Sequence, residues 1–144
     1  MSDSDLYAIA LYLKDQPGEN AAAQPLAARD PQMVAGAAIY RDLCSACHAP
    51  DGSGVAYLIP DLASASSVSS RESTSLLRVV IHGAQTVATA PEPTAPAMPA
   101  FGWQLTDAQI AAVVTYLRNS WGHAAPALSA SDVHKLRAPS AEGG

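Results

Sequence analysis

Cysteine is scarce in this chain, which has only two in 144 residues. Two cysteines are too few for a four-cysteine metal site, and if both serve one site none is left for a structural disulfide. Aromatic residues are also few, at 6%, although a hydrophobic content of 49% is enough for a packed core. No apolar run approaches the roughly 20 residues that a membrane-spanning helix needs. We therefore expect one compact domain with extensions and no membrane span in this chain.

Positive charge is in short supply, since 8 lysines and arginines stand against 13 aspartates and glutamates and the net charge is -5. A nucleic-acid partner would call for a basic face, so we expect none. The sequence also lacks a recognisable hydrolase triad motif and a glycine-rich phosphate loop. Residues 1–5 lack the basic start and apolar run of a secretory signal, which indicates that a signal has been removed or that the chain is an excised fragment.

The two cysteines belong to the most informative motif of the chain, Cys44-Ser45-Ala46-Cys47-His48. Two thiols at this spacing can add to the vinyl groups of a haem while the adjacent imidazole binds the iron. A thioredoxin-like dithiol or half of a zinc site would also use two cysteines, but neither accounts for the histidine, and no strand pattern precedes the motif. We predict one covalently bound haem c with His48 as an iron ligand.

The ligand on the other face of the iron is predicted to be Met98, in the segment Pro91–Pro99. Four prolines in this segment prevent a regular helix or a central strand, and a rigid loop could hold the thioether against the iron. A thioether ligand raises the reduction potential relative to a second histidine. The alternative ligands, which their positions favour less, are Met1, Met33, His82, His123 and His134.

Helical patterns account for much of the remaining chain. A helix is expected from Pro31, which follows Asp30 as a first-turn proline, into the cysteine motif. Thr106 and Gln109 form a capping box that opens another helix, which ends near Asn119. Shorter helices are expected at 73–81, stopped by His82-Gly83, and at 131–136, with an irregular loop at 49–70.

The chain also contains an internal similarity. Residues 2–14 align with residues 106–118, matching in helix cap, apolar face, Tyr-Leu pair and terminal basic residue. Residues 1–15 are therefore interpreted as a helix that remains from a preceding, similar domain, joined by a proline-containing linker at 16–30. The alternative is that two amphipathic helices are alike by composition alone.

A set of short motifs recurs along the chain in a familiar order: Cys44–His48, Asp51–Gly54, Pro60–Leu62, Met98–Phe101 and the Tyr116-Leu117 pair. Together they resemble a class I cytochrome c domain across residues 31–122. A narrower resemblance, to the last haem domain of the triple-haem cytochrome subunits of bacterial membrane-bound alcohol, aldehyde and sugar dehydrogenases, rests on Met98–Trp103, Asn119–Gly122 and Ser129–Val133. The implied fold is all-α, with helices packed around one haem c and long loops, and a C-terminal extension follows at 123–144.

The resemblance implies how two helices cross. Gly36 would allow the helix before the motif to approach the last helix closely, with Tyr40 beside Tyr116 and Leu117. Ordinary core positions on two helices would give the same burial. The Pro91–Pro96 run is longer than the loops typical of the family, so the resemblance covers the Met98 side of the haem less well.

Further roles that the resemblance implies concern the surroundings of the haem. The carbonyl of Pro60 would accept a hydrogen bond from the free ring nitrogen of His48, which fixes the tautomer of that ligand. Arg71 and Trp103 would pair with the haem propionates. The alternatives are a plain loop residue for Pro60, and simple solvation and packing for Arg71 and Trp103.

The ligand set predicts electron transfer rather than catalysis, because an iron closed on both faces has no open position for a substrate. The resemblance implies a relay in a periplasmic multihaem subunit of a membrane-associated parent protein. Its partners would be a dehydrogenase subunit, neighbouring haem domains, and quinone or a terminal oxidase as acceptor. The alternatives are a ligand-binding or peroxidatic haem module with a labile Met98, and a haem-free redox or metal-binding protein.

Overall fold

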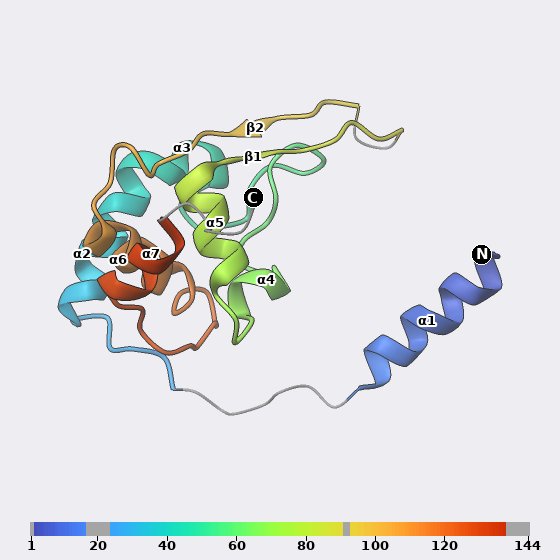
Figure 1. Cartoon of the computed structure of the whole chain (residues 1–144), viewed down its shortest axis with the longest axis horizontal. Helices are drawn as coiled ribbons and strands as arrows, with labels where there is room; N and C mark the ends of the chain where they lie inside the picture. The colour runs from blue at the N-terminus through green and yellow to red at the C-terminus, as the bar shows by residue number, and fades with distance from the viewer. Residues whose placement is uncertain (1, 17–23, 91–92, 138–144) are drawn as a thin grey trace, which may run out of the picture.

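The computed structural model describes residues 2–16, 24–90 and 93–137, and this part of the chain is mostly helical (Figure 1). The chain belongs to the all-α class, as predicted, with long loops between its helices. Its elements are α1 (Asp3–Asp15), α2 (Pro31–Ile39), a π-helical turn (Tyr40–Cys44), α3 (Ser45–His48), α4 (Ser66–Ser69), α5 (Thr74–His82), β1 (Ala84–Gln85), β2 (Ala97–Met98), α6 (Asp107–Leu117) and α7 (Ala130–Arg137).

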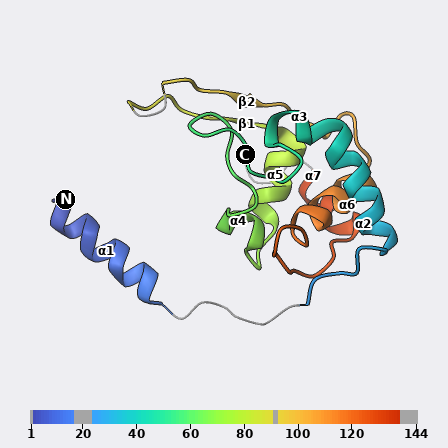
Figure 2. The same cartoon turned by 180° about the vertical axis from the view of Figure 1, so that it is seen from behind.

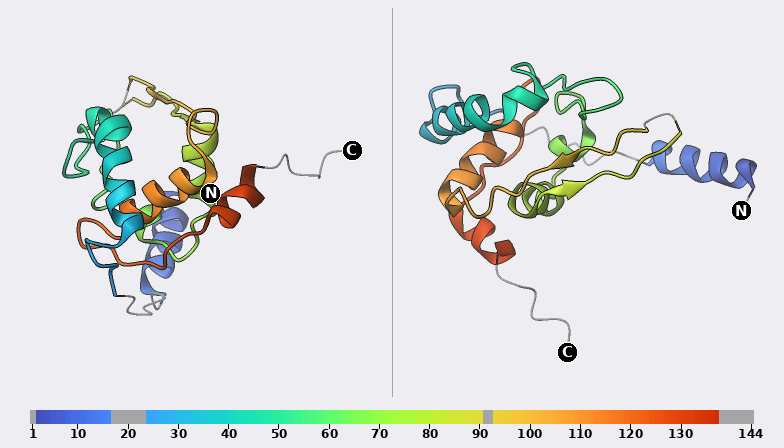
Figure 3. Two further views of the ribbon diagram at one scale, coloured as in Figure 1. Left: turned by 90° about the vertical axis from the view of Figure 1, so that its left-hand side faces the viewer. Right: turned by 90° about the horizontal axis from the view of Figure 1, so that it is seen from above.

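The crossing of α2 over α6 forms the framework of the domain (Figure 3, left). A Cβ atom on Gly36 would lie 2.6 Å from the Cβ of Tyr116, so only glycine allows the two backbones to come this close. The ring of Tyr40 lies 5.5 Å from that of Tyr116 and 5.3 Å from that of Trp121. Gly36 and Tyr40 therefore lie where the resemblance placed them.

Helix α6 is the centre of the core. Its capping box is present, because the Gln109 backbone N–H donates to Thr106 Oγ1 at 3.3 Å and the Thr106 N–H donates to Gln109 Oε1 at 2.9 Å. The apolar residues of the helix are buried on almost every side, since α2, α5 and α7 all pack against it. The fully buried members of this core include Ile110, Val113 and Val114.

The extension that follows residue 122 packs against the domain as far as Arg137. Val133 of α7 has no exposed surface. The Leu128 N–H donates to Thr115 Oγ1 at 2.9 Å, and Arg137 pairs with Asp107 at 2.6 Å at the start of α6. The segment before α7 shows no helical periodicity. It is held by hydrogen bonds between its backbone and side chains of the domain, such as Asn119 Nδ2, which donates to the Ala125 carbonyl at 3.0 Å.

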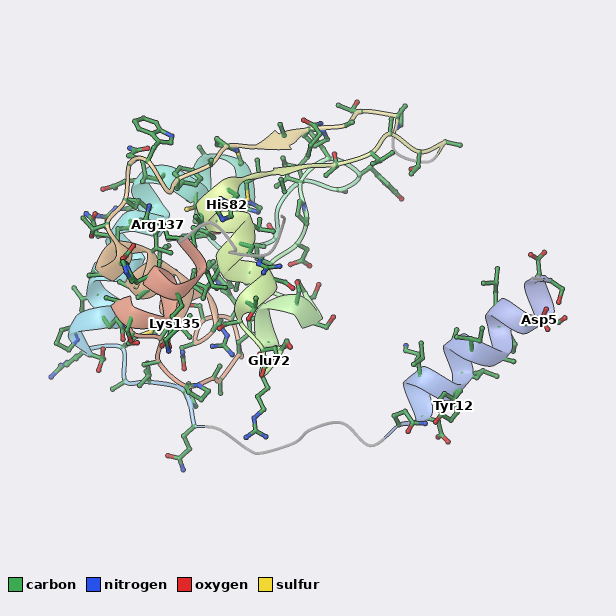
Figure 4. All side chains as sticks on the ribbon, in the orientation of Figure 1. Asp5, Tyr12, Glu72, His82, Lys135 and Arg137 are labelled. Atoms are coloured by element: carbon green, nitrogen blue, oxygen red, sulfur yellow. The ribbon has the colours of Figure 1, made fainter. Side chains whose placement is uncertain are left out.

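Helix α1 lies apart from the other helices in both views of the molecule (Figures 1 and 2). Every described residue of α1 is exposed, including Leu6 and Ile9 at 48% and Leu13 at 64%. Its side chains project without a covering element, as those labelled in Figure 4 illustrate. Part of the predicted linker, residues 17–23, lies outside the described residues, and beyond it Leu26 donates its N–H to Asn119 Oδ1 at 3.0 Å.

Three short elements were not predicted. The single turn α4 lies inside the expected loop 49–70 and buries Val68 completely. Strands β1 and β2 pair in an antiparallel arrangement of two residues each. Only β2 lies inside the expected loop Pro91–Pro99, and no element was predicted where β1 lies. Pro96 and Pro99 flank β2 and cannot donate to a ladder, which limits the pairing to these two residues. In the described part of the chain, no helix has the length and apolar character to cross a bilayer.

Candidate functional site

A cavity of about 310 Å³ brings together the residues that the sequence predicts to hold a haem. Cys44, Cys47 and His48 line it from the α3 side, Pro60 from the loop that follows, and Met98 from β2. Nearly all other lining side chains are apolar, as the hydrophobic macrocycle of a haem requires. The thiol pair, the imidazole and the thioether are also the donor types that a covalently attached, six-coordinate haem uses. The site therefore fits the predicted group.

The π-helical turn delivers the motif to this cavity. Such turns widen a helix by one residue and occur frequently at functional sites. Within this turn, Tyr40 is buried and its hydroxyl donates to the carbonyl of Ala49 at 2.5 Å, immediately after α3. Burial, reinforced by the nearby Cys44, raises the pKa of Tyr40 to about 12, so its hydroxyl keeps its proton. Tyr40 thus fixes the end of α3, where His48 lies.

His48 is oriented by the loop that follows it. Its Nδ1 lies 3.3 Å from the carbonyl oxygen of Pro60, while its own carbonyl accepts the Gly54 N–H at 3.0 Å. Burial lowers the pKa of His48, and the bond to Pro60 partly offsets this. A neutral imidazole that donates from Nδ1 keeps the lone pair of Nε2 for a metal ion.

In the sequence, Gly54 is notable only as part of the Asp51–Gly54 motif. Its φ is +63°, and a Cβ atom there would lie 2.6 Å from the Pro60 carbonyl oxygen. Any larger residue would push that oxygen away from His48. A glycine six residues after a haem-binding histidine is a weak sequence signal, because many turns contain glycine.

Met98 is held by the pairing of β2 with β1 rather than by an isolated loop. It pairs with Ala84 of β1. Thr86 Oγ1 donates to the carbonyl of Pro96 at 2.9 Å and ties the two arms together beyond the strands. Gly83, which sequence analysis identified only as a helix stop, has φ +76°, and a Cβ atom there would lie 2.6 Å from the Met98 carbonyl oxygen. Gly83 therefore allows the close approach that positions Met98.

The two cysteines do not have the properties of a catalytic dithiol. Both are free thiols, and Cys44 is partly buried while Cys47 is exposed. Burial, with a smaller contribution from Cys47, raises the pKa of Cys44 to about 11, whereas redox-active dithiols depend on a lowered thiol pKa. Among the residues that the structure describes, no group of three or more His, Cys, Asp or Glu side chains could hold a metal ion. The raised pKa of Cys44 disfavours the thioredoxin-like interpretation.

The alternative iron ligands within the described ranges do not line the cavity. Met33 is buried in α2. His123 Nε2 lies 3.0 Å from the Leu62 carbonyl oxygen, and His134 Nδ1 lies 3.2 Å from Asp107. His82, labelled in Figure 4, is exposed at the C-terminal end of α5. Met1 lies outside the described residues.

The two residues assigned to the haem propionates are not brought to this cavity. Neither Arg71 nor Trp103 lines it, and the side chain of Trp103 is 83% exposed. Sequence reasoning instead missed Arg118, which is only 1% exposed at the end of α6. Its Nη2 donates to the carbonyls of Ser70 at 2.7 Å and Arg71 at 3.1 Å. A basic residue at a helix end resembles an ordinary partner of the helix dipole, so the sequence carried no signal of its burial.

Comparisons with known proteins show the family of this chain. The family model for cytochrome c matches residues 33–121. The chain is 40% identical over 149 residues to the gluconate 2-dehydrogenase cytochrome c subunit of Pantoea cypripedii, covering 95% of this chain and 34% of that protein. It is also 40% identical over 147 residues to the cytochrome c subunit of a quinone alcohol dehydrogenase from Gluconacetobacter polyoxogenes, covering 94% and 31%. The chain thus spans about a third of the length of these relatives.

Proposed function

This chain belongs to the cytochrome c family, and on that basis we propose that it transfers single electrons through one haem c. The haem would be bound covalently through Cys44 and Cys47, with His48 and Met98 as the two iron ligands. The observation that carries the proposal is the single cavity that all four residues line. When bound, the haem supplies an iron that cycles between the ferrous and ferric states.

The surrounding residues are suited to such cycling because they limit rearrangement between the two states. Pro60 fixes the imidazole of His48, and the β1–β2 pair fixes the backbone of Met98. The apolar lining excludes water from the iron, which favours the ferrous state together with the thioether ligand. With both faces of the iron ligated, no position remains for a substrate, so the domain carries electrons and does not itself catalyse the oxidation of a substrate.

A second part of the proposal is that this haem is one relay of several. Ser2 and Asp5 of α1 form a capping box like that of Thr106 and Gln109 in α6. The apolar positions that α6 buries correspond to apolar positions that α1 exposes. We infer that α1 closes a preceding cytochrome c domain, where a partner helix covers its apolar face as α2 covers α6. Relatives about three times as long as this chain leave room for such domains.

The relay proposal is tested by the gene that encodes this chain. A Cys-x-x-Cys-His motif upstream of residue 1, at a distance of about one cytochrome domain, is the expected result. A coding sequence in which only a signal peptide precedes residue 1 would disprove the relay while leaving the single-haem function intact.

The names of the relatives suggest the partners. We propose that electrons arrive from a dehydrogenase subunit or from a neighbouring haem and leave toward quinone or a terminal oxidase. The location would be periplasmic, since bacterial cytochromes c acquire their haem outside the cytoplasmic membrane. The acidic net charge of -5 gives no reason to expect nucleic acid as a partner.

The purified holoprotein distinguishes electron transfer from the alternative functions. We expect the haem to remain attached after denaturing electrophoresis, which a haem-free dithiol or metal protein would not show. We also expect the reduced protein to bind carbon monoxide slowly or not at all, since Met98 would occupy the sixth position. Rapid binding of carbon monoxide by the native reduced protein would instead support the ligand-binding or peroxidatic module.

A further inference from the structure

A second cavity, of about 490 Å³, adjoins the first. The two share the loop residues Leu58, Ile59 and Pro60 and the hairpin residues Thr86 and Pro96. Neither cysteine, nor His48 or Met98, lines the second cavity. It therefore continues the first cavity away from the thiol pair, between the loop 53–61 and the hairpin.

The chemistry of the lining changes from one cavity to the other. The second cavity shares four apolar residues and Thr86 with the first. It adds side-chain oxygens from Ser53, Tyr57, Asp61 and Thr94, together with the apolar residues Val55 and Ala56. Some of these oxygens are already engaged, since Asp61 accepts hydrogen bonds from the backbone and hydroxyl of Ser64. The hydroxyls of Tyr57 and Thr94 make no hydrogen bond to the residues that the structure describes. Both residues are exposed, Tyr57 by 76%, so water solvates these hydroxyls when no ligand is bound.

A haem has the same division of chemistry. Its apolar macrocycle carries the vinyl groups on one edge and two propionate carboxylates on the opposite edge. Thioether bonds to Cys44 and Cys47 would fix the vinyl edge in the first cavity, so the propionate edge must point away from the cysteines. Resting on the function proposed above, we propose that the haem propionates extend into the second cavity, where Tyr57 and Thr94 donate hydrogen bonds to them.

The backbone of the loop supports this role for Tyr57. Val55 and Ile59 exchange backbone hydrogen bonds of 3.0 Å and 2.8 Å, which close a tight loop around Tyr57. The φ of Tyr57 is +62°, a left-handed conformation that is rare for a bulky residue and strains the backbone. Strain of this kind persists where the surrounding structure enforces it and is concentrated at functional sites.

The assignment differs from the pairing with Arg71 and Trp103 that the resemblance suggested. Neither residue lines either cavity, and no arginine or lysine of the described ranges does so. The propionates would therefore be held by neutral hydroxyl donors and by solvent at the cavity mouth. Asp61, the one carboxylate of the described lining, is oriented toward Ser64 by the two hydrogen bonds given above.

The test uses the ferrous holoprotein, which is diamagnetic and suitable for nuclear Overhauser measurements. We expect cross-peaks from the propionate methylene protons to the methyl group of Thr94 and the ring protons of Tyr57. We also expect the propionate bending band in the resonance Raman spectrum to shift in Thr94→Val and Tyr57→Phe. The matched variants Trp103→Phe and Arg71→Gln should leave this band in place.

The possible results separate the propionate assignment from the proposed electron-transfer function. Cross-peaks from the propionates to Trp103 or Arg71, or a band that shifts only in Trp103→Phe and Arg71→Gln, would overturn the assignment to the second cavity. Because all of these measurements require an attached haem, such a result would leave the proposed electron-transfer function standing. A purified protein without covalent haem would overturn the function itself, and the inference with it.

Discussion

Replacing Met98 by leucine is expected to abolish the sulfur-to-iron charge-transfer band of the ferric protein and to lower its midpoint potential. The fall should be on the order of 100 mV, because axial ligands set haem potentials over a range of about 0.8 V. Leucine has a similar volume but no donor atom, so the cavity keeps its shape while the iron loses its ligand. The visible spectrum of the ferric protein and a potentiometric titration measure the two effects.

The control for this experiment is Met33→Leu. Met33 is only 7% exposed in α2 and does not line the haem cavity, so its replacement repeats the chemistry of the change away from the iron. The band and the potential should both stay as in the parent protein. A band that survives in Met98→Leu and disappears in Met33→Leu, or in a His82 variant, would assign the sixth ligand elsewhere.

The sequence was most informative where one local pattern has one chemical meaning. The Cys44–His48 motif specifies its ligand chemistry within five residues. The capping box of Thr106 and Gln109 specifies where α6 begins, because it uses only contacts between residues three apart. Gly36 and Tyr40 could be placed because the resemblance supplied the partner helix, which no local pattern identifies.

The rest of the site depends on contacts between segments that are distant along the chain. Gly83 matters because the Met98 backbone passes against it, and Gly54 matters because the Pro60 carbonyl does. Each glycine alone predicts only a turn. The pairing of β1 with β2 likewise follows from the meeting of two irregular segments, neither of which shows the alternation of a strand.

The predicted propionate partners, Arg71 and Trp103, do not line the cavities, for a related reason. Arginine and tryptophan are side chains whose N–H groups suit a carboxylate, but neither Arg71 nor Trp103 lines either cavity. The residues that supply side-chain oxygens to the second cavity are common loop residues such as Ser53 and Thr94. These residues matter because the fold places them at the cavity, and a single sequence does not show that placement.

Arg118 connects three segments of the domain through its buried guanidinium. Nη2 donates to the carbonyls of Ser70 and Arg71 before α5, and Nη1 donates to the carbonyl of Pro126 at 3.4 Å before α7. Burial lowers its pKa, yet arginine remains charged in proteins, so these hydrogen bonds are made by a cation and are stronger than neutral ones. Its Nε finds no partner in the described part of the chain, which reduces the net gain.

Arg118→Met is accordingly expected to lower the free energy of unfolding by about 2–4 kcal/mol, because it leaves buried carbonyls without their donor. Chemical denaturation of the ferric holoprotein measures this loss. The matched control is Arg78→Met on α5, where the side chain is exposed and the same change should alter stability by no more than about 0.5 kcal/mol. Equal stability of the two variants would show that the segments before α5 and α7 hold their places without Arg118. A loss of stability in Arg118→Met alone would show that the guanidinium stabilises the packing of the segments before α5 and α7 against α6.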